Sequence, residues 1–165
     1  MSQSSIKFQP AWAPKEGILI PKSRIKPIHR SGIGALYEGD CLKILSEIEN
    51  ETVDTVFADP PFNLDKKYGS KVNDKLPEEE YVLWCKIWIK ECERILKPGG
   101  SIFLYNIPKW NIIFGSYLNE LGLTFRHWIA VNIKLSLPIQ GRLYPSHYSL
   151  LYYTKGRPKT FNKIG

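Results

Sequence analysis

The 165-residue chain lacks several features that define specialised classes of protein. It has no run of about 18 apolar residues, which excludes a transmembrane helix, and prolines and charges interrupt its N-terminal part, where a signal peptide would be continuous. Cysteine occurs only three times, at spacings that zinc sites do not use, so we expect reduced thiols and a cytoplasmic protein. The three histidines are scattered and give no pattern for a metal site.

The short motifs of several large enzyme groups are missing as well. The sequence contains no G-x-G-x-x-G dinucleotide-binding turn and no G-x-x-x-x-G-K-[ST] phosphate-binding loop. It also contains neither the H-E-x-x-H motif of metalloproteases nor the G-x-S-x-G turn of serine hydrolases. Function has to be inferred from charge and from a few local segments.

Charge is distributed unevenly along the chain. The formal net charge is +7, which divides into +5 for residues 1–32, −6 for residues 33–96 and +8 for residues 97–165. Basic ends around an acidic middle favour a surface that binds a polyanion such as nucleic acid. Charges that are merely solvated produce the same pattern, so charge alone leaves both interpretations open.

Composition separates a basic, proline-rich arm at residues 1–32 from a region of regular structure that starts at residue 33. Apolar periodicity predicts helices over residues 41–48, 77–95 and 109–121. Runs rich in β-branched and aromatic residues predict strands over residues 35–38, 53–58, 101–106, 125–133 and 148–154. This alternation predicts an α/β domain over residues 33–165, with a mainly parallel sheet and an antiparallel hairpin at its end.

The chemistry-bearing segment is Asp59-Pro60-Pro61-Phe62, which directly follows the strand predicted at 53–58. Ligands of open α/β sheets bind beyond the carboxyl ends of the strands, and two prolines make this segment rigid. The Asp59 carboxylate and the Pro60 carbonyl are hydrogen-bond acceptors, and Phe62 offers a ring for stacking. An acceptor pair beside an aromatic plane suits the amino group of a flipped adenine or cytosine. The simpler interpretation is that the prolines only end a strand.

Four segments in a fixed order favour the first interpretation. They are Gly39–Leu45, Val53–Asn63, Leu96–Phe103 and Tyr144–Gly156. In this combination the sequence resembles the S-adenosylmethionine-dependent amino methyltransferases of DNA, in the permuted beta-type class whose catalytic motifs precede the cofactor motif. The resemblance covers about residues 33–163. It implies a partial Rossmann-like methyltransferase fold, S-adenosyl-L-methionine as methyl donor, no metal, and double-stranded DNA as partner.

The resemblance also implies roles for individual residues. The catalytic residues would be Asp59, Pro60, Pro61 and Phe62, with the first two holding the target amino group and Phe62 stacking on the base. The residues that bind the methyl donor would be Asp40, Cys41 and Asp59, although Asp40 also suits a helix N-cap. The DNA-binding residues would be Asn63, Lys66, Lys67 and Lys71, in a loop that could equally be a solvated one. Trp84 and Trp88 lie on the apolar helix face, where core packing is expected.

The identity of the first motif residue bears on the target base. An aspartate there resembles the adenine-N6 group, whereas the cytosine-N4 group more often has serine. The expected reaction is therefore transfer of a methyl group to N6 of a flipped adenine, with cytosine N4 as the alternative. A non-catalytic DNA-binding derivative of the family stays open, as does a methyltransferase for RNA or protein amides, which usually carries the cofactor motif first.

The cofactor motif of the family, an acidic residue, Pro, Phe and a Gly-rich turn after a strand, does not occur in this sequence. We therefore expect a fold without the strands that carry this motif, and an unpaired, apolar edge on the strand at 53–58. A further expectation is that the chain is a fragment or one subunit of a split enzyme. A second chain or C-terminal half would then supply the cofactor motif and the target-recognition segment, and the chain alone would be inactive.

Overall fold

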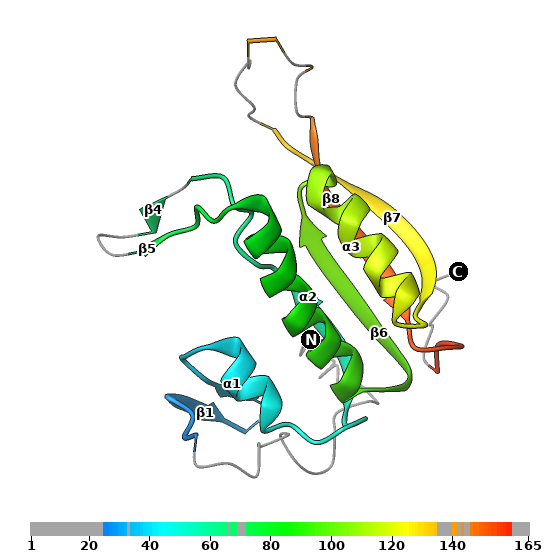
Figure 1. The fold of residues 1–165 in the computed structure, drawn as a ribbon. Helices are drawn as coiled ribbons and strands as arrows, with labels where there is room; N and C mark the ends of the chain where they lie inside the picture. Colours follow the sequence, from blue (N-terminus) through cyan, green and yellow to red (C-terminus); the bar gives the residue numbers. More distant parts are fainter. Residues whose placement is uncertain are drawn as a thin grey trace, which may run out of the picture.

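The computed structural model describes residues 25–32, 34–65, 67–68, 72–134, 140–141, 143 and 146–159, with only the backbone at 67–68 and 72–73. Its three helices are α1 (Cys41–Ser46), α2 (Glu78–Ile95) and α3 (Pro108–Glu120). Its strands are β1 (His29–Ser31), β2 (Gly34–Leu36), β3 (Val53–Ala58), β4 (Lys67–Tyr68), β5 (Val72–Asn73), β6 (Leu96–Asn106), β7 (Thr124–Asn132) and β8 (His147–Thr154). The helices and the larger strands match the expected order along the chain (Figure 1).

Four strands form the main sheet in the order β3-β6-β8-β7. β3 and β6 pair in parallel, whereas β8 pairs antiparallel with both β6 and β7. The α/β class and the terminal antiparallel hairpin are confirmed. The sheet is mixed, and fewer of its strand pairings are parallel than expected. The reason is that β8 lies between β6 and β7 and pairs antiparallel with both.

Helices α2 and α3 both lie in front of the sheet in the view of Figure 1, and the main core fills the layer between them and the strands. Along β6, alternate residues from Gly100 to Asn106 are buried, which is the period-2 pattern of a strand covered on one face. The opposite face carries Phe57 from β3 and a stacked pair of rings, Phe103 and Tyr152. None of the described helices is long and apolar enough to cross a membrane.

Helix α2 begins and ends where the sequence predicts, but the chain beyond it does not form a loop. Three glutamates occupy its first turn, where negative side chains interact favourably with the helix dipole. After Ile95 the backbone becomes extended at Leu96, and residues 96–100 already belong to β6. The Gly99 N–H donates to Lys155 O, and the Lys155 N–H donates to Gly100 O. These bonds hold the two glycines in the sheet instead of leaving them in a turn.

Helix α1 is held against α2 by partly buried leucines, Leu42 and Leu45, and by the hydrogen bonds of one arginine. None of its six residues is fully buried. The Arg94 guanidinium donates to the carbonyl oxygens of Leu45 at 2.8 Å and Ile48 at 2.9 Å, and it also bonds Asn50 and Glu91. These carbonyls lie at and just beyond the end of α1, where a helix leaves its last carbonyl groups without partners. Arg94 therefore fixes α1 against α2.

Strand β3 is an edge of the main sheet in the described part of the chain, because β2 pairs only with β1. Phe57 on this edge is 64% exposed. The expected unpaired, apolar edge is found, and β2 lies outside the main sheet. Of the expected arm at 1–32, residues 1–24 lie outside the described residues, and the boundary at residue 32 falls in the turn between β1 and β2. The division into arm and domain stays a prediction.

Two buried thiols on α2 predict a loss of stability at alkaline pH. Burial raises the pKa of both Cys85 and Cys92 to about 12, from an ordinary value of 9.0. Above about pH 9 the thiols ionise in the unfolded chain while the folded chain keeps their protons, so unfolding releases protons. The free energy of unfolding should therefore fall between pH 9 and pH 12, by at most about 1.4 kcal/mol per pH unit for each thiol.

Urea unfolding at several pH values measures this dependence. The double variant Cys85→Ala, Cys92→Ala serves as control, since it should show a shallower decline over the same pH range whatever its stability at pH 7. Equal slopes in the two proteins would contradict the assignment of the decline to these thiols.

Candidate active site

The Asp59–Phe62 segment lies where the sequence predicts, directly after the last residue of β3. β3 pairs in parallel with β6, so their carboxyl ends meet at one edge of the sheet. The segment leads into the polar loop that precedes α2. It has a pocket on one side and a cluster of aromatic rings on the other.

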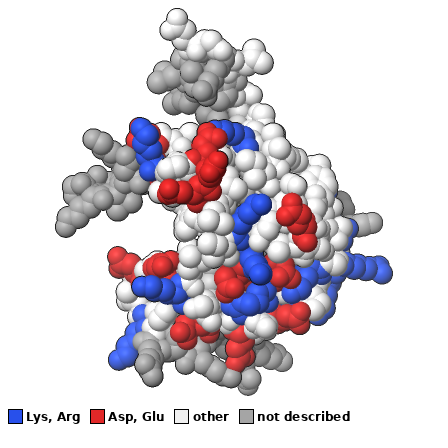
Figure 2. Space-filling view, in the orientation of Figure 1, with Lys and Arg blue, Asp and Glu red and all other residues white. Residues whose placement is uncertain are grey.

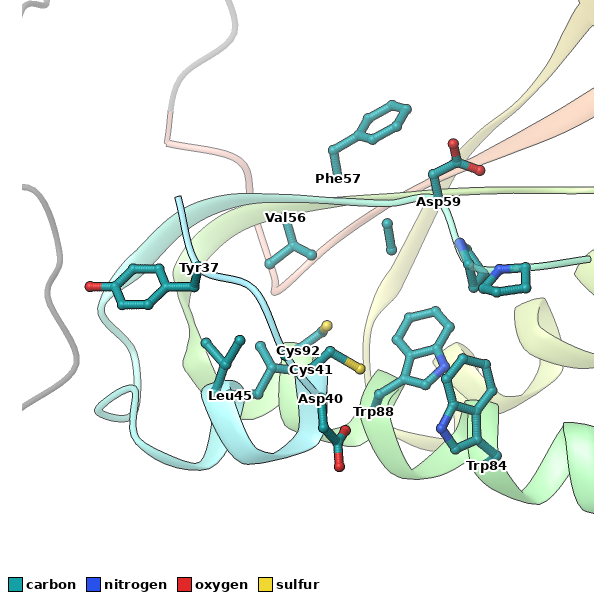
Figure 3. Close-up of a pocket in the computed structure, with 15 residues that line it drawn as sticks. Tyr37, Asp40, Cys41, Leu45, Val56, Phe57, Asp59, Trp84, Trp88 and Cys92 are labelled. Atoms are coloured by element: carbon teal, nitrogen blue, oxygen red, sulfur yellow. The ribbon is translucent and has the colours of Figure 1, made fainter. Parts of the chain in front are cut away.

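The pocket has a volume of about 720 Å³ and lies between β3, α1 and α2 (Figure 3). Asp40, Cys41 and Asp59, the residues expected to bind the methyl donor, are all among those that line it. The remaining lining residues are mostly apolar and include Val56, Pro60, Pro61, Trp84 and Trp88. The structure thus brings together residues as far apart in the sequence as Tyr37 and Cys92, which are 55 positions apart.

Asp40 has the second role that the sequence allows. Its carboxylate accepts a hydrogen bond from the Leu42 N–H at 3.0 Å, which caps the N-terminus of α1. The next residue, Cys41, is exposed at the pocket, where partial burial of its thiol, and then the Asp40 carboxylate, raise its pKa. An acidic group and a protonated thiol therefore form the α1 side of the pocket.

The side chain of Asp59 points away from the pocket. In Figure 3 its carboxylate lies on the same side of β3 as Phe57, whereas Val56, Trp84 and Trp88 lie on the other side. This follows from the alternation of side chains along a strand. The segment therefore separates an apolar pocket from the face of the sheet that carries the Asp59 carboxylate.

Three aromatic rings form a cluster on that face. The Phe62 ring lies 5.6 Å from Tyr105 at the end of β6 and 5.4 Å from Tyr148 at the start of β8, centroid to centroid. Tyr105 and Tyr148 contact each other at 5.6 Å. Partial burial, followed by Tyr148 and Asp59, raises the pKa of Tyr105, so its hydroxyl stays protonated near the Asp59 carboxylate. The cluster offers ring faces and edges next to the acceptors.

Hydrogen bonds from two helices hold the backbone of the segment. Tyr81 Oη on α2 donates to Pro61 O at 2.6 Å, and Trp110 Nε1 on α3 donates to Phe62 O at 2.7 Å. Within the described residues, the Asp59 carboxylate and the Pro60 carbonyl have no hydrogen-bond partner. The two acceptors that the sequence singles out are thus available to a ligand.

The expected DNA-binding residues are placed only in part. Asn63 adopts a positive φ of 56°, and its amide exchanges two hydrogen bonds with the backbone of Leu76, at 2.7 and 2.9 Å. In this structure its side chain closes the loop that leads to α2. Lys66 and Lys71 lie outside the described residues, and of Lys67 only the backbone in β4 is described.

Sequence reasoning missed several residues of this site. Core packing was expected for Trp84 and Trp88, and Trp88 is indeed buried, but both rings also line the pocket. The sequence places Tyr105 and Tyr148 in predicted strands and Trp110 in a predicted helix, and it indicates no further role for them. Their contacts with Phe62 span more than 40 residues, and no local pattern in the sequence signals such contacts.

Comparisons with known proteins show the family to which the chain belongs. Residues 53–164 match the family described as DNA methylase, for N6 and N4 methylation. The chain is 58% identical over 139 residues to the type II methyltransferase M.BamHI of Bacillus amyloliquefaciens. The matched region covers 84% of this chain and 33% of that enzyme. Identity to M.HpaI of Haemophilus parainfluenzae is 32%, over 74% of this chain and 38% of that enzyme. The chain spans about a third of the length of these curated relatives.

Among solved structures, the PvuII DNA methyltransferase, described as cytosine-N4-specific, matches with a TM-score of 0.67 and 22% identity, over 82% of this chain and 54% of that one. The complex of M1.HpyAVI with its methyl donor matches with a TM-score of 0.56 and 20% identity, over 77% of this chain and 59% of that one. These likenesses establish a shared Rossmann-like methyltransferase fold. Together with the family match over most of the sequence, they show that the chain belongs to the DNA methylase family of S-adenosylmethionine-dependent amino methyltransferases.

Proposed function

We propose that this chain forms the catalytic part of a site-specific DNA methyltransferase that modifies the exocyclic N6 amino group of a flipped adenine. The observation that carries this proposal is the pair of unpartnered acceptors, Asp59 and Pro60 O, between an apolar pocket and an aromatic cluster. The pocket would hold the methyl donor on one side of the segment. The extruded base would lie on the other side, against Phe62, with Tyr105 and Tyr148 behind that ring.

The pocket residues fit an adenosyl group in size and chemistry. A volume of about 720 Å³ is within the range of small-molecule sites, and indole rings and aliphatic side chains provide its apolar walls. The Asp40 carboxylate would accept hydrogen bonds from an amino or hydroxyl group at the α1 side. S-adenosylmethionine supplies an electrophilic methyl group on a sulfonium sulfur.

The residues of the chain would act on the amino group of the base. Asp59 and the Pro60 carbonyl would accept hydrogen bonds from the two N–H groups of this amino group. These bonds would direct the nitrogen lone pair toward the methyl carbon. The nitrogen would accept the methyl group that the bound donor supplies, with the donor sulfur leaving as a neutral thioether, and the surplus proton of the nitrogen would pass to solvent water. No covalent enzyme intermediate is required, because positioning and the negative charge of Asp59 support the developing positive charge on nitrogen.

The aspartate at position 59 supports adenine as the target. Cytosine N4 is the second candidate, because its amino group presents the same two donors and because the PvuII enzyme of similar fold is described as cytosine-N4-specific. Analysis of the methylated product distinguishes the two bases directly.

DNA contacts are proposed for the loop after the segment, through Asn63, Lys66, Lys67 and Lys71. Lysines near an extruded base suit the flanking phosphates. Figure 2 shows basic and acidic side chains intermingled over the helix-covered face, so the described residues of that face carry no continuous basic patch. We therefore place the path of the DNA along the sheet edge at Asp59–Phe62 and not across the helices.

The free edge of β3 supports a further part of the proposal. A second polypeptide segment, which carries the cofactor motif and the target-recognition region, would pair with this edge and complete the sheet. Without it, we expect weak binding of the methyl donor and no turnover. With it, the pocket would be closed on its β3 side.

A methyl transfer assay with tritiated donor tests the proposal. The chain is assayed alone and fused to the remaining part of the Bacillus amyloliquefaciens enzyme, whose matched region is 58% identical. The fusion should methylate DNA and yield N6-methyladenine, and isothermal titration should show tighter binding of the donor than for the chain alone. If the product is N4-methylcytosine, the target base is cytosine and not adenine. Robust turnover by the chain alone would overturn the need for a second segment. A folded but inactive fusion would overturn the enzyme assignment.

A further inference from the structure

Two buried aromatic side chains bind consecutive carbonyl groups of the catalytic segment. Tyr81 and Trp110 are each 2% exposed, and they donate to Pro61 O and Phe62 O at 2.6 and 2.7 Å. They come from different helices, α2 and α3, and their rings contact each other at 4.9 Å. The segment is thus held from one side by two donors that belong to the packed core.

The Tyr81 hydroxyl is itself fixed. Asn106, which is fully buried at the end of β6, donates from Nδ2 to Tyr81 Oη at 3.1 Å and accepts from the Ile107 N–H at 2.8 Å. The Asn106 carbonyl accepts from Ser149 Oγ on β8 at 3.0 Å. Because Tyr81 Oη accepts from the asparagine, its own proton is directed at Pro61 O. Burial also raises the pKa of Tyr81, so the hydroxyl remains a donor.

The prolines make external donors important. Neither Pro60 nor Pro61 has an N–H group, so only Asp59 and Phe62 could donate from the backbone of the segment. The rings fix φ at both prolines, and Pro61 also restricts ψ of Pro60, but no ring restricts ψ of Pro61 or Phe62, which sets the direction of their carbonyls. The hydrogen bonds to the carbonyl oxygens of Pro61 and Phe62 restrict these two angles.

We propose that Tyr81 and Trp110 are positioning residues of the methyl transfer reaction: by binding the carbonyls of Pro61 and Phe62, they leave the Pro60 carbonyl and the Asp59 carboxylate directed at the target amino group. This inference rests on the proposed function. It adds two hydrogen bonds through which the core between α2, α3 and β6 fixes the direction of the acceptor groups. A tilt of the Pro61 peptide plane would turn the Pro60 carbonyl away from the amino group.

The variant Tyr81→Phe tests this inference, because it removes the hydroxyl and keeps the ring in the core. Its matched control is Tyr153→Phe, since Tyr153 is also buried, at 3% exposure, and its hydroxyl donates to the Gly115 carbonyl of α3 at 3.0 Å, away from the catalytic segment. Tyr81→Phe loses the bond to Pro61 O and the bond accepted from Asn106, whereas Tyr153→Phe loses the bond to Gly115 O. Tyr81→Phe should therefore lose somewhat more stability, but only Tyr81→Phe releases a carbonyl of the catalytic segment.

Two readouts separate positioning from stability. In the active fusion protein, Tyr81→Phe should lower kcat about fivefold or more while KM for the methyl donor stays unchanged, and Tyr153→Phe should leave both constants as they are. In the 15N-labelled chain alone, the indole N–H of Trp110, identified by its loss in Trp110→Phe, should exchange with solvent faster in Tyr81→Phe than in Tyr153→Phe.

The outcomes decide the inference and the proposed function separately. Equal effects of the two tyrosine variants on kcat overturn the positioning role. If the wild-type fusion transfers no methyl group, the proposed function fails. The inference is then decided by the indole exchange rate, and equal rates in the two variants overturn it as well.

Discussion

Replacing Asp59 with alanine is expected to lower methyl transfer by about 100-fold or more in the fusion protein, with binding of DNA largely retained. The carboxylate has no hydrogen-bond partner among the described residues, so its removal leaves no donor unpaired and should not destabilise the fold. Its removal does withdraw one of the two acceptors and the negative charge from the target amino group. The loss should therefore appear in kcat more than in KM for DNA.

An aspartate near the start of β3 provides the control. Asp54 is exposed and pairs with Lys97 at 2.8 Å, at the opposite end of the strand from the catalytic segment. Asp54→Ala removes the same charge as Asp59→Ala and should leave kcat within about twofold, because exposed ion pairs contribute little. The kcat of Asp59→Asn should lie between those of Asp59→Ala and Asp54→Ala, since asparagine keeps an acceptor oxygen and loses the charge. Full activity of Asp59→Ala would contradict the proposed role.

Replacing Phe114 with alanine should cost about 3–5 kcal/mol of the free energy of unfolding. Phe114 is fully buried on α3, and its ring lies 6.1 Å from the ring of Tyr81 on α2. Truncation would open a cavity between the two helices. The loss is a large part of the stability of an ordinary domain, so the variant should unfold at much lower urea concentration.

Ile112→Ala is the matched control for this change. Ile112 lies on the same helix but is 66% exposed, so its truncation removes apolar surface that already contacts water. We expect a change within about 0.5 kcal/mol. Urea unfolding followed by circular dichroism compares the two variants, and similar losses in both would show that Phe114 is not part of a packed core.

The elements and the catalytic segment could be predicted because their signals are local. The β-branched run at Val53–Ala58 followed by two prolines determines where β3 ends and where Asp59 begins a rigid turn. The strand order could not be predicted in the same way. β8 has four buried and no exposed residues, whereas β7 is mostly exposed. Only the pairing of both strands with the rest of the sheet shows that β8 is the inner strand.

The sequence singles out the motif residues of the candidate site but not the residues that contact them. Asp40 and Asp59 belong to segments with recognisable patterns, and both are at the pocket, although the Asp59 carboxylate points to the other side of β3. Tyr81, Trp110 and Asn106 support the motif through hydrogen bonds between elements, and a helix or strand residue carries no sequence mark of such a bond. The strand predicted at 101–106 starts earlier for a related reason, because backbone bonds to a distant residue, Lys155, hold Gly99 and Gly100 in β6.

The attachment of α1 by Arg94 has a consequence for ligand affinity. One wall of the pocket, on α2 and β3, belongs to the core, whereas the other wall, with Asp40 and Cys41, belongs to a helix without a fully buried residue. We therefore expect α1 to open with a lower free energy than global unfolding. If the pocket holds the methyl donor as proposed, the observed dissociation constant would equal the intrinsic constant divided by the fraction of molecules in which α1 is docked. Bound donor would in turn protect the amides of α1 from hydrogen exchange.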